Sequence, residues 1–244
     1  LTEDQFYKLQ DVLINPFPFS VMVKPRKTCE ESVHSVILVH STFDNFKKRT
    51  AIRSTWGSTV NKSFIWPRVG PLNHSMALFF VFGKYKDESK NDGIYEENLE
   101  FGDIVQGNFV DSYKNMTLKS LLDFKFIIEF CSMAKFLIKS DDDMFINLPF
   151  LLNEMDEMPK RSIMGALCVG SKTRRFGKWL ITKEEFPFET YPTYEAGATY
   201  VITRDLWEDI FNASYFVPYI FIDDVYITGI IGKILNVTHV SKNK

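Results

Sequence analysis

Three consecutive carboxylates, Asp141, Asp142 and Asp143, directly follow the apolar segment 134–140. Carboxylates this close repel one another and lose solvation in a folded chain, so a cation between them would stabilise the group. Their hard oxygen atoms favour Mg²⁺ or Mn²⁺, which could bridge to an anionic substrate such as a diphosphate. The alternative is an acidic turn that caps the following helix, and the triplet alone leaves both interpretations open.

A second acidic pair, Asp223 and Asp224, follows the apolar residues 219–222 and precedes a helix-like segment, 225–235. One of these carboxylates could serve as a general base close to the first acidic group. The alternative is a pair that caps the helix and is stabilised by its dipole. On spacing alone the capping interpretation comes first.

Arg49 and Arg53 lie four residues apart in a segment that we expect to be helical from Asp44 to Trp56. This spacing puts both guanidinium groups on one helix face, where they could clamp an anion. The alternative is a solvated basic face that pairs with nearby acidic residues, and the pattern by itself favours that alternative.

Several functional classes have no support in this chain. It contains neither G-x-x-x-x-G-K-[ST] nor G-x-G-x-x-G, which argues against a P-loop kinase or a dinucleotide oxidoreductase. It also lacks H-E-x-x-H, paired C-x-x-C and G-x-S-x-G, the patterns of zinc proteases and serine hydrolases. The net charge of −2 indicates no nucleic-acid partner.

The elements that must position these groups alternate along the chain. The 244 residues are 45% apolar, enough for one domain with a sizeable core. Alternating strands and helices predict an α/β fold with a mostly parallel central sheet, in which ligands bind beyond the carboxyl ends of the strands. We expect strands at 33–40, 76–82, 103–105 and 134–140, and helices at 44–56, 95–101, from Asn115 or Thr117 onward, and at 147–158.

The first 32 residues contain Pro16, Pro18 and Pro25 and are expected to form an irregular, stem-like lead-in, with the domain spanning 33–244. The chain opens on Leu1, which suggests that an N-terminal piece precedes it. Its longest apolar stretches fall well short of the ~18 to 20 residues that a membrane-spanning helix needs.

Five N-x-[ST] sequons, at Asn61, Asn73, Asn115, Asn212 and Asn236, compare with roughly 1.7 expected by chance from 13 Asn and 32 Ser and Thr. This excess favours a secretory route, with chance occurrence as the alternative. The three cysteines allow one disulfide and leave one thiol over, and they do not decide the compartment.

Five segments, taken together and in order, closely resemble the β-1,3-glycosyltransferases of family 31, the galactosyltransferase and N-acetylglucosaminyltransferase group. They cover the chain from about residue 29 to 235. The segments are RTAIRSTWG (49–57), DSYKNMTLK (111–119), KSDDDMFIN (139–147), YPTYEAG (191–197) and DDVYITG (223–229).

The resemblance implies a GT-A-type fold, Mn²⁺, and UDP-galactose or UDP-N-acetylglucosamine as the sugar donor. The sugar would pass with inversion to the 3-hydroxyl of an acceptor glycan. It further implies a type II membrane protein of the Golgi with a lumenal catalytic domain, held by an N-terminal anchor outside this chain.

The resemblance also assigns residues. Asp143 would be the direct Mn²⁺ ligand, and Asp141 and Asp142 would hold ribose or sugar hydroxyls and order the site. Arg49 and Arg53 would lie by the nucleotide, and Lys139 would support the same pocket. Asp224 would be the general base, and Gly197 would lie where donor and acceptor meet.

Two departures from the family pattern stand out. Asp223 occupies a position where the family usually has Glu, and the family's histidine metal ligand lies further downstream than this chain extends. His239 is the one downstream histidine and is the candidate metal ligand, although its spacing is short. The domain is therefore expected to be C-terminally incomplete. The alternatives are a degenerate member that binds glycans or partners and, more weakly, a metal-dependent phosphohydrolase.

Overall fold

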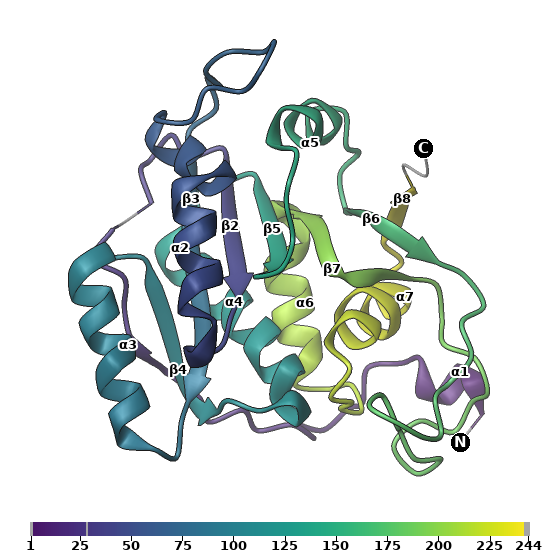
Figure 1. Cartoon of the computed structure of the whole chain (residues 1–244). Helices are drawn as coiled ribbons and strands as arrows, with labels where there is room; N and C mark the ends of the chain where they lie inside the picture. The colour runs from purple at the N-terminus through teal and green to yellow at the C-terminus, as the bar shows by residue number, and fades with distance from the viewer. Residues whose placement is uncertain (1, 28, 242–244) are drawn as a thin grey trace.

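One eight-stranded sheet runs through the computed structural model, which describes residues 2–27 and 29–241 (Figure 1). The strand order is β1-β4-β3-β2-β5-β7-β6-β8. The strands are β1 (Val21–Val23), β2 (Ser35–His40), β3 (Met76–Lys84), β4 (Ile104–Val110), β5 (Phe136–Asp141), β6 (Ser162–Cys168), β7 (Tyr194–Thr203) and β8 (Thr238–Ser241).

The four central strands β4, β3, β2 and β5 are parallel, and β1 and β7 run antiparallel to their neighbours. β8 adds to β6 in parallel at the edge. All six residues of β2 are buried, because this strand lies mid-sheet with helices over both faces. The mostly parallel α/β sheet expected from the sequence is confirmed.

Helices cover both faces of the sheet (Figure 1). Alternate residues of β2 divide between two hydrophobic clusters: Val36 and Leu38 pack with α4 and α6, and Ile37 and Val39 pack with α2, α3 and α5. The helices are α1 (Glu3–Phe6), α2 (Phe46–Ser54), α3 (Glu88–Phe101), α4 (Met116–Phe130), α5 (Leu148–Met155), α6 (Trp207–Ser214) and α7 (Gly232–Ile234), with a π-helical segment, Val225–Ile231, before α7.

Some element boundaries differ from those predicted. α3 starts at Glu88, seven residues before the expected 95, because the side chain of Asp87 caps it by accepting from the Ser89 N–H. The expected helix 44–56 is shorter, Phe46–Ser54, with 3₁₀ turns on either side. β4 extends to Val110, well past the expected 105.

The lead-in belongs to the same folded unit, so the predicted boundary at residue 32 is wrong. β1 pairs with β4, and the lead-in buries two aromatic rings. Phe6 packs against Phe186, and Phe19 packs against Phe109. The prolines make the backbone irregular, but burial of these rings holds the segment on the domain.

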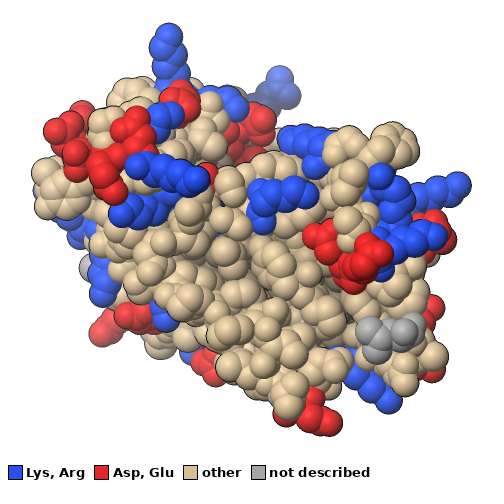
Figure 2. All heavy atoms as spheres, turned by 90° about the horizontal axis from the view of Figure 1, so that it is seen from below, with Lys and Arg blue, Asp and Glu red and all other residues tan. Residues whose placement is uncertain are grey.

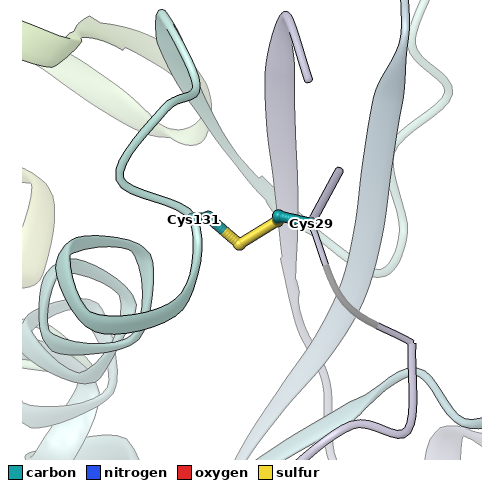
Figure 3. Close-up of a disulfide and its surroundings, with 2 residues drawn as sticks. All are labelled: Cys29 and Cys131. Atoms are coloured by element: carbon teal, nitrogen blue, oxygen red, sulfur yellow. A yellow bond between two sulfur atoms is a disulfide. The ribbon is translucent and has the colours of Figure 1, made fainter. Parts of the chain in front are cut away.

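A disulfide joins Cys29 of the lead-in to Cys131 at the end of α4, across 102 residues (Figure 3). Cys168 carries the free thiol. This pairing resolves the choice that the three cysteines left open. It ties the lead-in covalently to the helix that covers one face of the sheet.

Charged side chains of both signs mix on the surface. Figure 2, a view from below Figure 1, shows Lys and Arg beside Asp and Glu around the rim of that face, with a wide uncharged area between them. Because the charges on this face are of both signs, an anion would be recognised by individual side chains and not by a broad positive surface. Within the described ranges, each helix is too short or too polar to cross a bilayer.

Replacing Cys29 and Cys131 together with serine is expected to lower the free energy of unfolding by about 2–5 kcal/mol, because the unfolded chain is then no longer closed into a large loop. Urea denaturation measures the change. Cys168→Ser is the matched control and is expected to stay within about 0.5 kcal/mol of the parent. Equal unfolding free energies for all three proteins would contradict the pairing.

Candidate active site

The three aspartates of the acidic triplet lie at the carboxyl edge of the parallel strands but in different surroundings. β5 ends at Asp141, which pairs in register with His40 at the end of β2. The exposed fraction of the side chain is 38% for Asp141, 7% for Asp142 and 66% for Asp143. The three carboxylates therefore differ in solvent exposure and are considered one at a time.

Asp142 faces the protein. Its Oδ2 accepts hydrogen bonds from Ser41 Oγ at 2.7 Å and Asn45 Nδ2 at 2.8 Å, and its Oδ1 accepts one from Lys48 Nζ at 3.0 Å. These donors occupy a buried carboxylate, so Asp142 orders the site, whereas its contact with ribose or sugar hydroxyls stays a prediction. Asp142 anchors the start of α2 to the end of β5.

Asp143 faces solvent. The one ion pair of its carboxylate within the described part of the chain is with Lys48, whose Nζ lies 3.7 Å from Oδ2. An exposed carboxylate is a suitable ligand for a hard divalent cation, which proteins often hold by one or two carboxylates together with substrate phosphates and water. The donor chemistry at Asp143 and the partly exposed Asp141 thus fits Mg²⁺ or Mn²⁺.

His239 does not join this group. β8 lies three strands away from β5, about 14 Å at ~4.8 Å per strand. His239 pairs in register with Ile163 of β6, and its Nδ1 lies 3.3 Å from Glu195 Oε1. The prediction of His239 as a metal ligand beside Asp143 is therefore wrong, because the order of the strands separates them.

A buried ammonium group links the first acidic group to β7. Lys139 Nζ donates to Asp141 Oδ1 and to the Gly197 carbonyl, both at 2.6 Å, and lies 3.8 Å from Asp223 Oδ2. Burial works to lower the pKa of Lys139, but the charges of Asp223 and Asp141 outweigh burial and raise that pKa. The lysine therefore remains a cation at the centre of the site.

Gly197 connects this cation to Asp224. The Gly197 N–H donates to Asp224 Oδ2 at 2.8 Å, while the carbonyl of the same residue accepts from Lys139. A Cβ on Gly197 would lie 3.1 Å from Asp224 Oδ2, so glycine admits the close approach of that carboxylate. The structure thus brings the two acidic motifs together, as the general-base hypothesis requires.

Asp224 is the N-cap of the π-helical segment, and its Oδ1 accepts from the Val225 N–H at 2.7 Å. The capping interpretation holds for Asp224 but not for Asp223, whose Oδ2 accepts from Ser120 Oγ, and for Asp224 it coexists with a position in the site. Burial, together with the charge of Asp223, raises the pKa of Asp224 to about 6, against the lowering effect of its two N–H donors and Lys139. A carboxylate with such a pKa is largely ionised at pH 7 and can accept a proton.

Two cavities meet at Asp224 and Trp179. The smaller, about 240 Å³, is bounded by Tyr113, Lys139 and Asp141 among others. The larger, about 540 Å³, is lined by Tyr191 and Tyr194 together with Lys172 and Arg174, and the Trp179 side chain is half exposed. Aromatic faces of this kind can pack against sugar rings.

Sequence reasoning did not assign a role to these aromatic residues. Tyr191 and Tyr194 lie in the segment YPTYEAG, which was noted only for its glycine. Trp179 lies outside every matched segment. The missed signal was the aromatic content around Gly197, which becomes informative once the fold places β7 beside the π-helical segment.

Arg49 and Arg53 do not clamp an external anion. Arg49 is fully buried and donates to Glu97 from Nε at 2.8 Å and from Nη2 at 2.6 Å. Arg53 donates to Asp103 at 2.9 and 2.8 Å and to Glu97 at 2.8 Å. The prediction that they lie against the nucleotide is therefore wrong, and pairing with nearby acids is right, although the pairs are buried and not solvated.

The buried ion pairs of Arg49 and Arg53 support the site indirectly, through a hydrogen-bonded chain to Asp142. Arg49 Nη1 donates to Ser41 Oγ at 3.0 Å, and that hydroxyl donates to Asp142. Burial works to raise the pKa of Glu97, but the hydrogen bonds and charges of Arg49 and Arg53 outweigh burial and lower that pKa. Glu97 is therefore ionised and holds α2 against α3.

Glu97→Ala is expected to destabilise the fold by about 3–5 kcal/mol, because it leaves the buried guanidinium of Arg49 without a carboxylate, while Arg53 keeps only Asp103. Chemical denaturation measures the loss. Lys47→Ala, an exposed change on the same helix as Arg49, is the control and is expected to be near neutral. A loss no larger than that of the control would show that the buried pairs are not structural.

The comparisons with known proteins define the class. The family model described as "Galactosyltransferase" matches residues 47–243. The chain therefore belongs to the galactosyltransferase family, and the resemblance to family 31 is confirmed.

Curated relatives agree with this membership. Beta-1,3-galactosyltransferase 1 of Mus musculus is 31% identical over 220 residues, 88% of this chain and 65% of the relative. Beta-1,3-galactosyltransferase 5 of Pan paniscus is 32% identical over 196 residues, 79% of this chain and 62% of the relative. The chain thus spans slightly less than two thirds of the length of these relatives.

Two solved structures are more distant. Mouse xyloside xylosyltransferase 1 in its apo form is 12% identical with a TM-score of 0.39, covering 86% of this chain and 84% of that one. The mannosyltransferase Ktr4p of S. cerevisiae is 10% identical with a TM-score of 0.41, covering 93% and 73%. At these scores they add nothing to the argument.

Proposed function

We propose that this member of the galactosyltransferase family is an inverting glycosyltransferase. It transfers galactose, or N-acetylglucosamine, from a UDP-sugar to the 3-hydroxyl of an acceptor glycan. The observation that carries the proposal is the position of Asp224, a carboxylate with a pKa of about 6 where two cavities meet. The names of the relatives, which are β-1,3-galactosyltransferases, support galactose and the β-1,3 linkage.

The smaller cavity is the proposed site of the donor. Lys139 is buried there among carboxylates and fixes Asp141 and the Gly197 carbonyl. Asp143, with Asp141 nearby, would hold Mn²⁺. When bound, this ion supplies positive charge for the diphosphate leaving group.

The larger cavity is the proposed site of the acceptor. Trp179, Tyr191 and Tyr194 offer aromatic faces to a sugar ring, and Asp224 lies at the boundary with the donor site. Asp224 accepts the proton of the acceptor hydroxyl while that oxygen attacks the anomeric carbon and UDP departs. The N–H groups of Gly197 and Val225 keep the carboxylate aimed during proton transfer.

We also propose a Golgi location with a lumenal catalytic domain and an N-terminal anchor outside this chain. The sequon asparagines Asn61, Asn73, Asn212 and Asn236 are exposed, as glycosylation requires. The disulfide between Cys29 and Cys131 is typical of an oxidising compartment. Both observations are consistent with passage through the secretory route.

Asp224→Asn is expected to lower kcat about 10²- to 10⁴-fold, because the amide cannot accept the acceptor's proton, while UDP binding is retained. Initial rates with UDP-galactose and UDP-N-acetylglucosamine over a panel of glycan acceptors, together with calorimetry, measure both effects. Asp209→Asn, on the exposed face of α6, is the control and is expected to keep full turnover. Unchanged turnover in Asp224→Asn would remove this residue from its role.

The same assignment fixes the pH dependence of the parent. The base acts when ionised, so kcat/KM is expected to rise with pH through about 6 and then to level off. The residual activity of Asp224→Asn is expected to lack this rise. A rise that persists in the variant would assign it to another group.

Asp143→Ala is expected to abolish Mn²⁺-dependent binding of UDP, because it removes the most exposed carboxylate of the site. Calorimetric titration with UDP, in Mn²⁺ and in EDTA, measures the effect. The parent and Asp209→Asn are expected to bind UDP with Mn²⁺ only. Full binding by Asp143→Ala would contradict its role, and no binding by the parent in either buffer would contradict the proposed donor site.

A further inference from the structure

Three potential metal ligands gather at the edge of the sheet opposite the candidate active site. His34 lies just before β2, His74 lies in the loop before β3, and Asp156 follows α5. His34 and His74 come just before the first residues of β2 and β3, and Asp156 contacts both, so the group lies at the amino ends of the parallel strands; in Figure 1 the arrow of β2 points away from α5. Among the described residues, this is the one group of at least three His, Cys, Asp or Glu side chains whose ligand atoms lie close enough to share an ion.

The distances from each imidazole to the carboxylate of Asp156 are close to those around a tetrahedral ion. His34 Nε2 lies 3.2 Å from Asp156 Oδ1, and His74 Nε2 lies 3.4 Å from Asp156 Oδ2. One ligand atom of each residue lies within 4.8 Å of the others. Zinc–ligand bonds of about 2.0–2.1 Å require ligand atoms about 3.3 Å apart in a tetrahedron. Small side-chain adjustments would therefore place all three around one ion.

Charge also favours an ion at this position. The two imidazole rings lie with their centroids 4.5 Å apart and share one carboxylate. Two protonated rings at this distance would repel each other beside a single negative charge, and His34 is also largely buried, with 10% of its side chain exposed. Neutral rings present nitrogen lone pairs, which a divalent cation accepts.

We propose that His34, His74 and Asp156 bind a zinc ion at a site separate from the candidate active site. Two imidazoles and one carboxylate suit Zn²⁺, whereas Mn²⁺ and Mg²⁺ prefer oxygen ligands such as Asp143. The three residues leave a fourth position for water, because His74 and Asp156 are partly exposed. The ion would tie the loop before β3 to α5 and to the start of β2.

The test is titration of metal-free protein with ZnCl₂, followed by calorimetry and by thermal unfolding. The parent is expected to bind one equivalent, with a rise in Tm that EDTA reverses. His74→Ala is expected to bind at least tenfold more weakly, and Asp156→Asn also more weakly. His74 is the residue of choice because it is partly exposed, so its removal leaves the buried core in place.

Two controls separate this site from others. His239→Ala removes an unrelated histidine and is expected to bind zinc as the parent does. Asp143→Ala is likewise expected to keep zinc binding, and Co²⁺ is expected to give the visible absorption of a tetrahedral complex in the parent but not in His74→Ala. Zinc binding by His74→Ala with the affinity of the parent, or loss of zinc binding in Asp143→Ala, would overturn the proposal, as would a parent that binds no zinc. The His–Asp contacts would then be ordinary hydrogen bonds.

Discussion

The buried ammonium of Lys139 is the constraint on which the candidate site depends. A cation in the interior costs several kcal/mol of solvation unless carboxylates and hydrogen-bond acceptors surround it. Asp141, Asp223 and the Gly197 carbonyl provide these groups from β5, from the start of the π-helical segment and from β7. Their common partner fixes the relative positions of three elements that are distant in sequence. Removing any one of them would leave a buried charge partly uncompensated.

A second buried charge group holds the other side of the site. Glu97 on α3 pairs with Arg49 on α2, and Ser41 connects Arg49 to Asp142. Asp142 and Asp141 are consecutive, so the two buried groups meet within the acidic triplet. The residues just before Asp143 are therefore held in place by both buried groups. A carboxylate offered to a cation benefits from such support, because the ion is held only as firmly as its ligands.

The sequence predicted the central sheet because its signal is local. Continuous apolar runs before 40, 82 and 140 indicate strands buried on both faces, and these became β2, β3 and β5. The antiparallel strands β6 and β7 were not predicted, because each is fully buried over only part of its length, and pairing with strands distant in sequence determines which part. The lead-in was misjudged for a related reason. Prolines indicate only the local backbone conformation. The packing of the lead-in depends on Phe6 and Phe19, whose ring contacts are with residues more than 80 positions away.

The site residues also divide into those that local sequence indicates and those whose position depends on distant contacts. Asp141, Asp143 and Asp224 stood out as candidates because adjacent carboxylates repel one another and cost solvation in a folded chain. Whether a given charge faces a ligand or a buried partner depends on the tertiary structure, and here Arg49 and Asp142 turned inward. Gly197 shows the limit most clearly. The resemblance explained it by room for the substrates, but the structure puts Asp224 Oδ2 at 3.1 Å from the position of its missing Cβ. The glycine leaves room for the carboxylate of Asp224, the proposed general base, to accept its N–H, and that contact holds the carboxylate at the boundary between the two cavities.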